Sequence, residues 1–420
     1  MRIRNLDIDL NTEGWEKSEG RSNNVWGQVP ISNLPFNLFD EAIAKNKKSC
    51  IWTCYDEEIY KKDKDGNILP IDLNNLPPTI SATLKLYFEN KYSVVAENMG
   101  MKIAVTLDLP TSYNYIVKFD KEKYPQVLRN FSNPSLKDKV LPYAIVSIDF
   151  LKAQQTPERV LEDGTVTSFS GDELILFEKS IRHSKIIENG ASIDGYRDNI
   201  EFRYIENWIK SINYYAEKLL TNVSKEEMEQ DIKKINSRIV RSFLLREFIG
   251  DCDFTDKNGG LVVNRELKTV TYAPNFDYGE SFNSLILNKF FTLPPKNVLD
   301  EILKWDPKYV ERKEANARGI LAESLAQTYA SDASKRNLQY VIKNYPEDVK
   351  EFTTSLVNMI YDHTLEKIVE SYTAEHDVED ALLSNEEAKM FKIYLNTRAG
   401  WLQSQLNKSI SAHAEDEKSL

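Results

Sequence analysis

The chain has 420 residues, of which 41% are hydrophobic and 11% aromatic, so it can bury the core of one large domain or of two smaller units. Its net charge of -11 argues against a general nucleic-acid binder or a protein that coats anionic membranes. No segment approaches the roughly 20 apolar residues of a membrane-spanning helix, and the amino terminus lacks the apolar stretch of a signal peptide. We therefore expect a cytoplasmic protein.

The cysteines and histidines offer no recognisable disulfide framework or zinc site. Only Cys50, Cys54 and Cys252 occur, and the four histidines are far apart in the sequence. We expect Cys50 and Cys54 to be packing residues of a strand-rich segment.

The first third of the chain predicts short strands. Strand-like residues at 49–55 are followed by a hairpin-turn signal at 63–67. Alternation of apolar and polar residues then predicts a strand over 81–88, and apolar residues at helical spacing predict a helix over 93–107. Further strands are expected at 113–119 and 143–151, followed by a polar connection over 152–171.

From about residue 199 the apolar residues recur with the period of a helix. Two helices are expected before residue 250, and a short strand pair at 261–263 and 269–272 interrupts the helical pattern. Helices follow at 318–330 and 349–372, and the polar residues 413–420 predict a disordered tail.

The candidate chemistry lies at this interruption. Asp253 stands five residues before Asn258, directly after a predicted buried helix, and Asp277 follows 19 residues later in an Asp-Tyr-Gly element. Phosphoryl transfer needs a group that orients the accepting hydroxyl and oxygen ligands for magnesium, and carboxylates and a side-chain amide supply both.

Acidic residues between helices are often only turn formers or helix caps. The order of buried helix, D-x-x-x-x-N loop, two-stranded ribbon and second Asp favours the catalytic interpretation, because it brings three oxygen ligands to one cleft. We expect Asp251 and Asp256 to cap or solubilise the loop, or to assist a second metal. Arg241 and Arg246 of the preceding helix are expected to face solvent and to pair with nearby acidic residues.

These motifs resemble those of the HipA-type bacterial serine/threonine kinases, which include CtkA-like enzymes. The resemblance covers about residues 80 to 300 and rests on Phe248-Ile249-Gly250-Asp251-Cys252-Asp253 with Asn258, on Ala273-Pro274-Asn275-Phe276-Asp277, and on an upstream lysine-bearing strand and glutamate-bearing helix. It implies an α+β, two-lobed kinase-like fold, with a small β-rich lobe over 1–150 and a larger helical lobe over 151–420.

The resemblance also implies roles. Asp253 would be the catalytic base or hydroxyl-orienting residue, and Asn258 and Asp277 would bind Mg²⁺. The chain departs from the family in two places: Cys252 and Phe254 flank Asp253 where His or Arg is usual, and no glycine- or serine-rich phosphate loop precedes Lys85.

For the lysine that contacts the ATP phosphates, we favour Lys85 with Glu97 as its helix partner. Lys118 is the alternative lysine, but prolines interrupt the segment that follows it. Asp149 and Phe150 are the candidate hinge that would bind adenine.

The expected function is ATP- and Mg²⁺-dependent phosphorylation of a Ser or Thr of a protein. Relatives further suggest a toxin-antitoxin setting with an antitoxin-like regulator, and no direct nucleic-acid binding is expected. The alternatives are a small-molecule or lipid kinase of related fold, and an inactive nucleotide-binding pseudokinase that acts as an interaction module.

Overall fold

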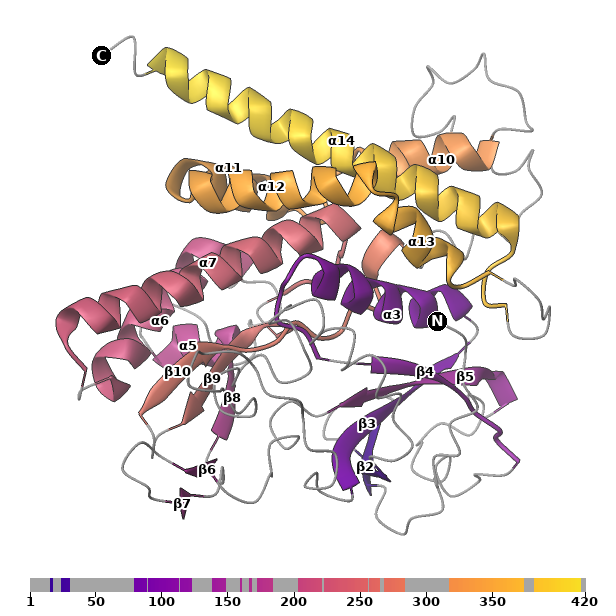
Figure 1. The fold of residues 1–420 in the computed structure, drawn as a ribbon, viewed down its shortest axis with the longest axis horizontal. Helices are drawn as coiled ribbons and strands as arrows, with labels where there is room; N and C mark the ends of the chain where they lie inside the picture. The colour runs from indigo at the N-terminus through magenta and orange to yellow at the C-terminus, as the bar shows by residue number, and fades with distance from the viewer. Residues whose placement is uncertain are drawn as a thin grey trace.

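The computed structural model describes residues 16–17, 24–30, 79–88, 90–112, 114–122, 138–148, 159–160, 166–167, 172–183, 203–220, 223–255, 257–264, 268–283, 317–373 and 381–416. Within these segments the chain is mixed α/β and mostly helical, with strands on one side and a layer of helices on the other (Figure 1). No helix among them is long and apolar enough to cross a membrane.

The largest sheet has five antiparallel strands in the order β1-β2-β3-β5-β4. Leu84 and Leu86 of β3 are buried while Lys85 between them is partly exposed, as the alternation predicts. The three predicted strands of this sheet are confirmed, and the last begins and ends three residues earlier than predicted. The strands are Glu16–Lys17 (β1), Asn24–Pro30 (β2), Thr79–Phe88 (β3), Asn114–Lys118 (β4) and Val140–Ile148 (β5).

Helix α3 (Lys91–Thr106) confirms the predicted helix after β3 and lies between the large sheet and helix α13 (Thr364–Glu370) (Figure 1). It begins at Asn90, whose side chain accepts a hydrogen bond from the Tyr92 N–H at 3.1 Å. Because both faces of α3 are covered, most of its residues are buried, including Glu97 at 4% exposure.

A smaller antiparallel sheet, β10-β9-β8, packs with helices α5 to α7. Its strands β9 and β10 confirm the predicted strand pair. Helix α7 begins with a capping box between Ser224 and Glu227 and ends at Gly250, which adopts the left-handed conformation at φ 63°. The elements are β8 (Asp172–Leu176), α5 (Phe177–His183), α6 (Ile205–Leu219), α7 (Lys225–Ile249), β9 (Gly260–Asn264), β10 (Thr269–Tyr272) and the 3₁₀ turn η7 (Ser281–Asn283).

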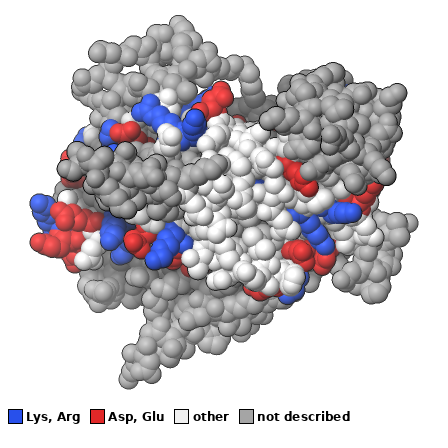
Figure 2. Space-filling view, turned by 90° about the horizontal axis from the view of Figure 1, so that it is seen from above, with Lys and Arg blue, Asp and Glu red and all other residues white. Residues whose placement is uncertain are grey.

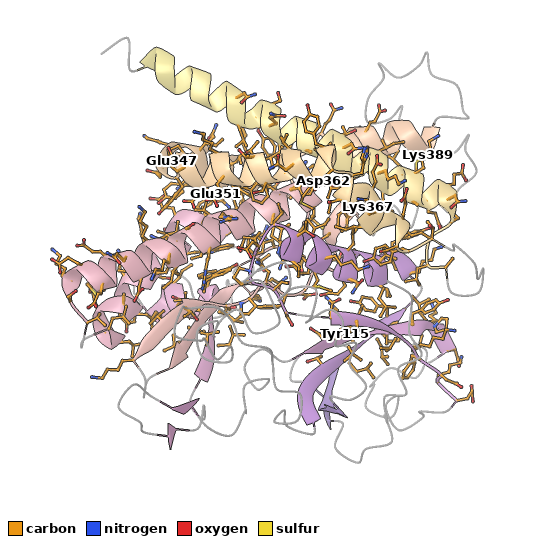
Figure 3. All side chains as sticks on the ribbon, in the orientation of Figure 1. Tyr115, Glu347, Glu351, Asp362, Lys367 and Lys389 are labelled. Carbon is orange, nitrogen blue, oxygen red and sulfur yellow. The ribbon has the colours of Figure 1, made fainter. Side chains whose placement is uncertain are left out.

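The remaining helices form the outer layer, where Glu347, Glu351 and Lys389 are exposed (Figure 3). On the face that Figure 2 shows, the Lys and Arg side chains of the described residues are interspersed with Asp and Glu, so the described part of this face has no extended basic surface. The helices are α10 (Ala317–Ala326), α11 (Ser334–Asn344), α12 (Pro346–Tyr361), α13 and α14 (Asn385–Asp416).

One sequence prediction for this layer is wrong. The single helix expected over 349–372 is two helices, because the chain breaks at His363, which has φ 59°. Helix α14 extends to Asp416, and the disordered tail expected over 413–420 stays a prediction.

Several predictions fall outside the described residues. These are the strand at 49–55 with Cys50 and Cys54, and the turn at 63–67. Of the polar connection at 152–171, the described part is a two-stranded ribbon, β6 (Arg159–Val160) and β7 (Val166–Thr167). The two-lobed division at residue 150 stays a prediction.

Candidate active site

Asn275 fixes the segment after β10 to the loop that follows α3 and to helix α7. The Asn275 backbone N–H donates to the Pro110 carbonyl at 2.9 Å, and its own carbonyl accepts from the Ser112 N–H at 2.7 Å. The Asn275 side chain donates to the Pro110 carbonyl at 2.9 Å and to the Ser242 hydroxyl of α7 at 2.8 Å. These contacts set the position of the backbone two residues before Asp277.

Asp277 adopts φ 62°, a left-handed conformation that costs a residue with a side chain about 1 kcal/mol or more. Such a conformation persists where surrounding contacts enforce it, and it is concentrated at functional sites. The next residue, Tyr278, is fully buried and shares a hydroxyl–hydroxyl hydrogen bond of 2.9 Å with Thr111. The Asp277 side chain is 42% exposed and points back toward β3.

Lys85 of β3 joins helix α3 to Asp277. Its ammonium forms an ion pair with the Glu97 carboxylate at 3.1 Å and a second, shorter ion pair with the Asp277 carboxylate. The Tyr87 hydroxyl also donates to Glu97, at 3.3 Å. Burial alone would lower the pKa of Lys85, but Glu97, Tyr87 and Asp277 outweigh burial and raise this pKa well above its usual value, so Lys85 stays charged.

Gly279 leaves the space that this lysine occupies. A Cβ at residue 279 would lie 3.3 Å from the Glu97 carboxylate and 3.5 Å from the Lys85 ammonium. The glycine of the Asp-Tyr-Gly element therefore lets the backbone pass close to the ion pair.

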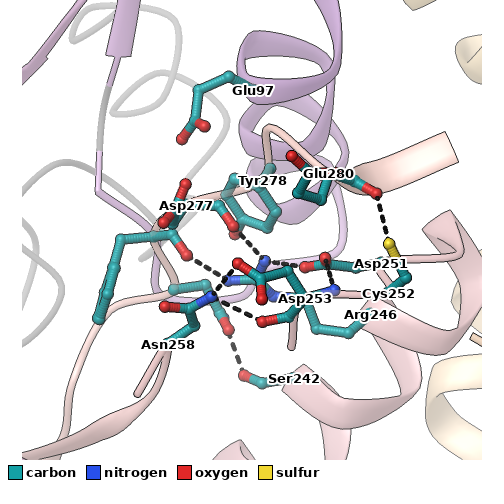
Figure 4. A network of polar contacts seen from close by, with 12 residues as sticks. Glu97, Ser242, Arg246, Asp251, Cys252, Asp253, Asn258, Asp277, Tyr278 and Glu280 are labelled. Atoms are coloured by element: carbon teal, nitrogen blue, oxygen red, sulfur yellow. Dashed lines mark hydrogen bonds and ion pairs between the residues drawn. The ribbon is translucent and has the colours of Figure 1, made fainter. Parts of the chain in front are cut away.

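The predicted catalytic loop follows Gly250 and brings Asp253 and Asn258 together (Figure 4). The Asn258 side-chain amide donates to the Asp253 carbonyl at 2.7 Å and to its carboxylate at 3.1 Å. The five-residue spacing thus closes a compact turn in which both side chains are partly or fully exposed. The side-chain carbonyl of Asn258 remains as an oxygen donor for a cation.

Several carboxylates face one another across this site. Burial and the neighbouring Asp277 carboxylate raise the pKa of Asp253, although Asn258 opposes the shift. Burial, Asp253, Asp251 and Asp277 likewise raise the pKa of Glu280. The Lys85 ammonium has the opposite effect on Asp277 and lowers its pKa. A bound cation would relieve the repulsion between Asp253 and Asp277.

The donor set fits Mg²⁺ in its chemistry. A carboxylate and an amide oxygen are hard ligands of the kind that Mg²⁺ takes, with water and phosphate oxygens completing its octahedron. In the described part of the chain, no group of three or more His, Cys, Asp or Glu side chains is placed to hold a metal by itself.

The structure brings five predicted site residues together, since Asn258 contacts Asp253, and it separates a sixth, Lys118. Lys85 and Asp277 are in contact, and Glu97 and Asp253 lie on either side of them. Lys118 lies exposed on the edge strand β4, while Lys85 lies on the interior strand β3. The hinge candidates Asp149 and Phe150 and the loop residue Asp256 are outside the described residues.

The predicted solvent exposure of Arg246 is wrong. Its side chain is 1% exposed and pairs with Asp251, whose side chain is fully buried. The predicted solubilising role of Asp251 is therefore wrong. The helical period of α7 already placed Arg246 near apolar positions, but a charged residue so near the helix end is more often exposed.

No family model and no curated protein sequence matches the chain. Its structure is similar to that of the Helicobacter pylori proinflammatory kinase CtkA, with a TM-score of 0.43, 13% identity, and coverage of 80% of this chain and 92% of CtkA. It is also similar to HipA in the Shewanella oneidensis MR-1 complex of HipA, HipB and operator DNA, with a TM-score of 0.35, 11% identity, and coverage of 93% of this chain and 74% of that chain. Because both TM-scores are below 0.5, membership of the HipA-type kinase family stays a prediction. The function proposed below is therefore based on the arrangement of the side chains.

Proposed function

We propose that this protein is an ATP- and Mg²⁺-dependent kinase that transfers the γ-phosphoryl group to a hydroxyl. One observation supports this most directly: Lys85 lies between Glu97 and Asp277, beside the Asp253–Asn258 turn. A phosphate-binding cation, a metal-binding carboxylate and a hydroxyl-orienting carboxylate are the groups that phosphoryl transfer requires.

Each side chain has a distinct task in this proposal. Lys85 binds the nucleotide phosphates, and Glu97 keeps its ammonium oriented when the phosphates replace Asp277 as a partner. Asp277 and Asn258 would hold Mg²⁺, which when bound neutralises charge on the phosphates. Asp253 accepts a hydrogen bond from the attacking hydroxyl and takes its proton, and the raised pKa of Asp253 favours that transfer.

The acceptor class follows from the sequence resemblance. We propose a Ser or Thr of another protein as the acceptor, and an antitoxin-like protein as a regulator. A small-molecule or lipid kinase would share the same phosphate and metal groups, and a pseudokinase would bind nucleotide without transfer.

The test is transfer of radiolabel from γ-labelled ATP to the protein itself and to proteins of a lysate, in the presence of Mg²⁺. Lys85→Met, Asp253→Asn and Asp277→Asn are each expected to lower transfer by about 100-fold or more, because each removes a group that acts on the reacting phosphates or hydroxyl. Lys118→Met is the matched control, since it removes a lysine from strand β4 of the same sheet, which β5 separates from β3. It should keep full transfer.

The outcomes separate the candidate functions. Label on small metabolites but not on proteins would favour a small-molecule kinase. Nucleotide binding without transfer to any acceptor would favour the pseudokinase. If Lys118→Met, and not Lys85→Met, abolished transfer, the proposed site would be wrong.

A further inference from the structure

Arg246 is the buried residue that contacts both halves of the candidate site (Figure 4). It lies in the last turn of α7, and its guanidinium donates to the Asp277 carbonyl at 2.9 Å and to the Phe276 carbonyl at 2.5 Å. These are the two backbone carbonyls that flank the left-handed Asp277 Cα. The planar fork of the guanidinium can contact both at once, which a lysine ammonium does less specifically.

The same guanidinium forms an ion pair with Asp251. The other oxygen of the Asp251 carboxylate accepts a hydrogen bond from the Asp253 backbone N–H at 3.1 Å. Arg246 thus reaches the Asp277 backbone directly and the Asp253 backbone through one carboxylate. The two carboxylates of the proposed kinase come from loops more than 20 residues apart in sequence, and this contact chain joins them.

Aromatic rings enclose the guanidinium. It lies 4.0 Å from the centre of the Tyr278 ring and 4.9 Å from that of Phe254. Both aromatic residues directly follow a site aspartate, since Tyr278 comes after Asp277 and Phe254 after Asp253. Their packing on one guanidinium keeps water from the ion pair and adds a second link between the loops.

We propose that the Arg246–Asp251 pair is a positioning element that sets Asp253 and Asp277 in register for catalysis. The inference rests on the proposed kinase function and adds two residues to it, neither of which touches the reacting groups. Its consequence is that removing the pair lowers the turnover rate while nucleotide affinity is largely kept, because Arg246 makes no contact with the phosphate-binding pair Lys85 and Glu97.

A second buried ion pair, which links α7 to α14, provides a matched control. Arg398 of α14 pairs with Glu247, the neighbour of Arg246 in sequence, at 3.2 Å, with side-chain exposures of 1% and 2%. Arg398 also donates to backbone carbonyls, at Glu247 and Ala326. The two pairs therefore match in burial and in bonding, but the Arg398 pair contacts the outer helices and not the site.

The experiment compares two double variants in the radiolabel assay. Arg246→Met with Asp251→Leu, and Arg398→Met with Glu247→Leu, each replace a buried pair by apolar side chains and leave no buried charge unpaired. The site variant is expected to lose about 100-fold in kcat with less than about a threefold change in nucleotide Kd. The control variant is expected to keep kcat within about threefold.

The single variant Arg246→Lys is the second measurement, because it keeps the charge beside Asp251 and is less disruptive to folding. It should also lower kcat, by about 10-fold, since lysine cannot bind two carbonyls and a carboxylate in one plane. Circular dichroism and thermal unfolding report whether each variant is folded.

Three results would overturn the proposal: an unchanged kcat in folded Arg246→Lys or in the folded site double variant, an equal loss of kcat in the Arg398 pair, or a loss that appears only in nucleotide Kd. Wild type is measured in the same assay and reports on the kinase function itself. A wild-type protein without transfer would refute the kinase proposal and the positioning role with it. If the wild type transfers phosphate and the Arg246→Met, Asp251→Leu variant remains equally active, only the positioning role is refuted.

Discussion

Replacing Gly100 by alanine tests how closely helix α3 and the Asp277 segment are packed. Gly100 is buried in α3 and faces Tyr278, and a Cβ at residue 100 would lie 2.6 Å from Tyr278 Cγ and 2.8 Å from Tyr278 Cβ. The ring cannot swing away easily, because its hydroxyl is bonded to Thr111 at 2.9 Å and its face packs on Arg246. The backbone beside Asp277 would have to shift instead.

The expected size of the effect follows from two opposing contributions. Alanine in place of glycine within a helix stabilises it by about 0.5–1 kcal/mol. Overpacking of a filled core costs about 1–3 kcal/mol, and contacts well under 3 Å with the base of a ring lie at the upper end of that range. We therefore expect Gly100→Ala to lower the free energy of unfolding by about 1–2 kcal/mol.

Urea unfolding measures this difference, and Gly400→Ala is the matched control. Gly400 lies in helix α14, and a Cβ at residue 400 would have no atom within 4 Å, so only the propensity gain applies there and the variant should be more stable than wild type. Because the shift at Tyr278 also moves Asp277, Gly100→Ala should lower phosphoryl transfer. Equal stabilisation by both substitutions, with transfer unchanged, would refute the packing argument.

Three further predictions concern single groups. Ser224→Ala removes the capping box of α7 and should lower the free energy of unfolding by about 1 kcal/mol in urea; no change would mean that the cap is not formed in solution. Cys252 is an exposed residue, but partial burial of its thiol and nearby carboxylates raise the pKa of that thiol to about 11. Its alkylation by iodoacetamide at pH 8, followed by peptide mass spectrometry, should therefore be about 100-fold slower than that of free cysteine. A rate equal to that of free cysteine would contradict this pKa. Burial raises the pKa of Asp251 from 3.8 to about 6, so between these pH values the folded state holds a proton that the unfolded state releases. The free energy of unfolding should therefore fall as pH rises from about 4 to 6. Urea titrations across this range measure that slope, and Asp251→Asn should remove the part of it that Asp251 contributes.

The local sequence pattern was sufficient to predict the strand, the helix and the loop that carry the candidate site residues. The alternation at 81–88 and the helical spacing after it predicted β3 and α3, because one buried face and a change of period are properties of short segments. The spacing between Asp253 and Asn258 predicted that both lie in one loop of the site, and the two side chains are in contact there. The choice of Lys85 over Lys118 rested on the helix that follows β3.

Other features depend on contacts between distant segments and leave no local pattern. Arg246 was assigned to solvent because its sequence neighbourhood does not show Phe276 and Asp277, whose carbonyls it contacts from about 30 residues away. The break between α12 and α13 was missed because no proline or glycine marks it, and His363 carries the positive φ instead.

The position of Glu97 depends most clearly on contacts with segments that are distant in the sequence. The Tyr372 hydroxyl, just after α13, donates to the Asn98 side chain at 2.7 Å, and Asn98 donates to the Asn114 side chain at 2.9 Å. Asn114 in turn donates to the Glu97 carbonyl at 3.1 Å. This buried chain of hydrogen bonds links the C-terminal helices to the residue that orients Lys85.

Helix α3 has further contacts with the same helices. Tyr92 and Lys91 at its start bond Glu387 of α14, and Lys102 near its end donates to Ser371 at 2.8 Å. Since α3 is held at its start, its middle and its end, moving the helix away from Lys85 would break several hydrogen bonds, and each buried one costs about 1–3 kcal/mol when one partner is left unsatisfied. The C-terminal helices, whose role no motif indicates, thereby hold α3 in the position that forms the Lys85–Glu97 ion pair.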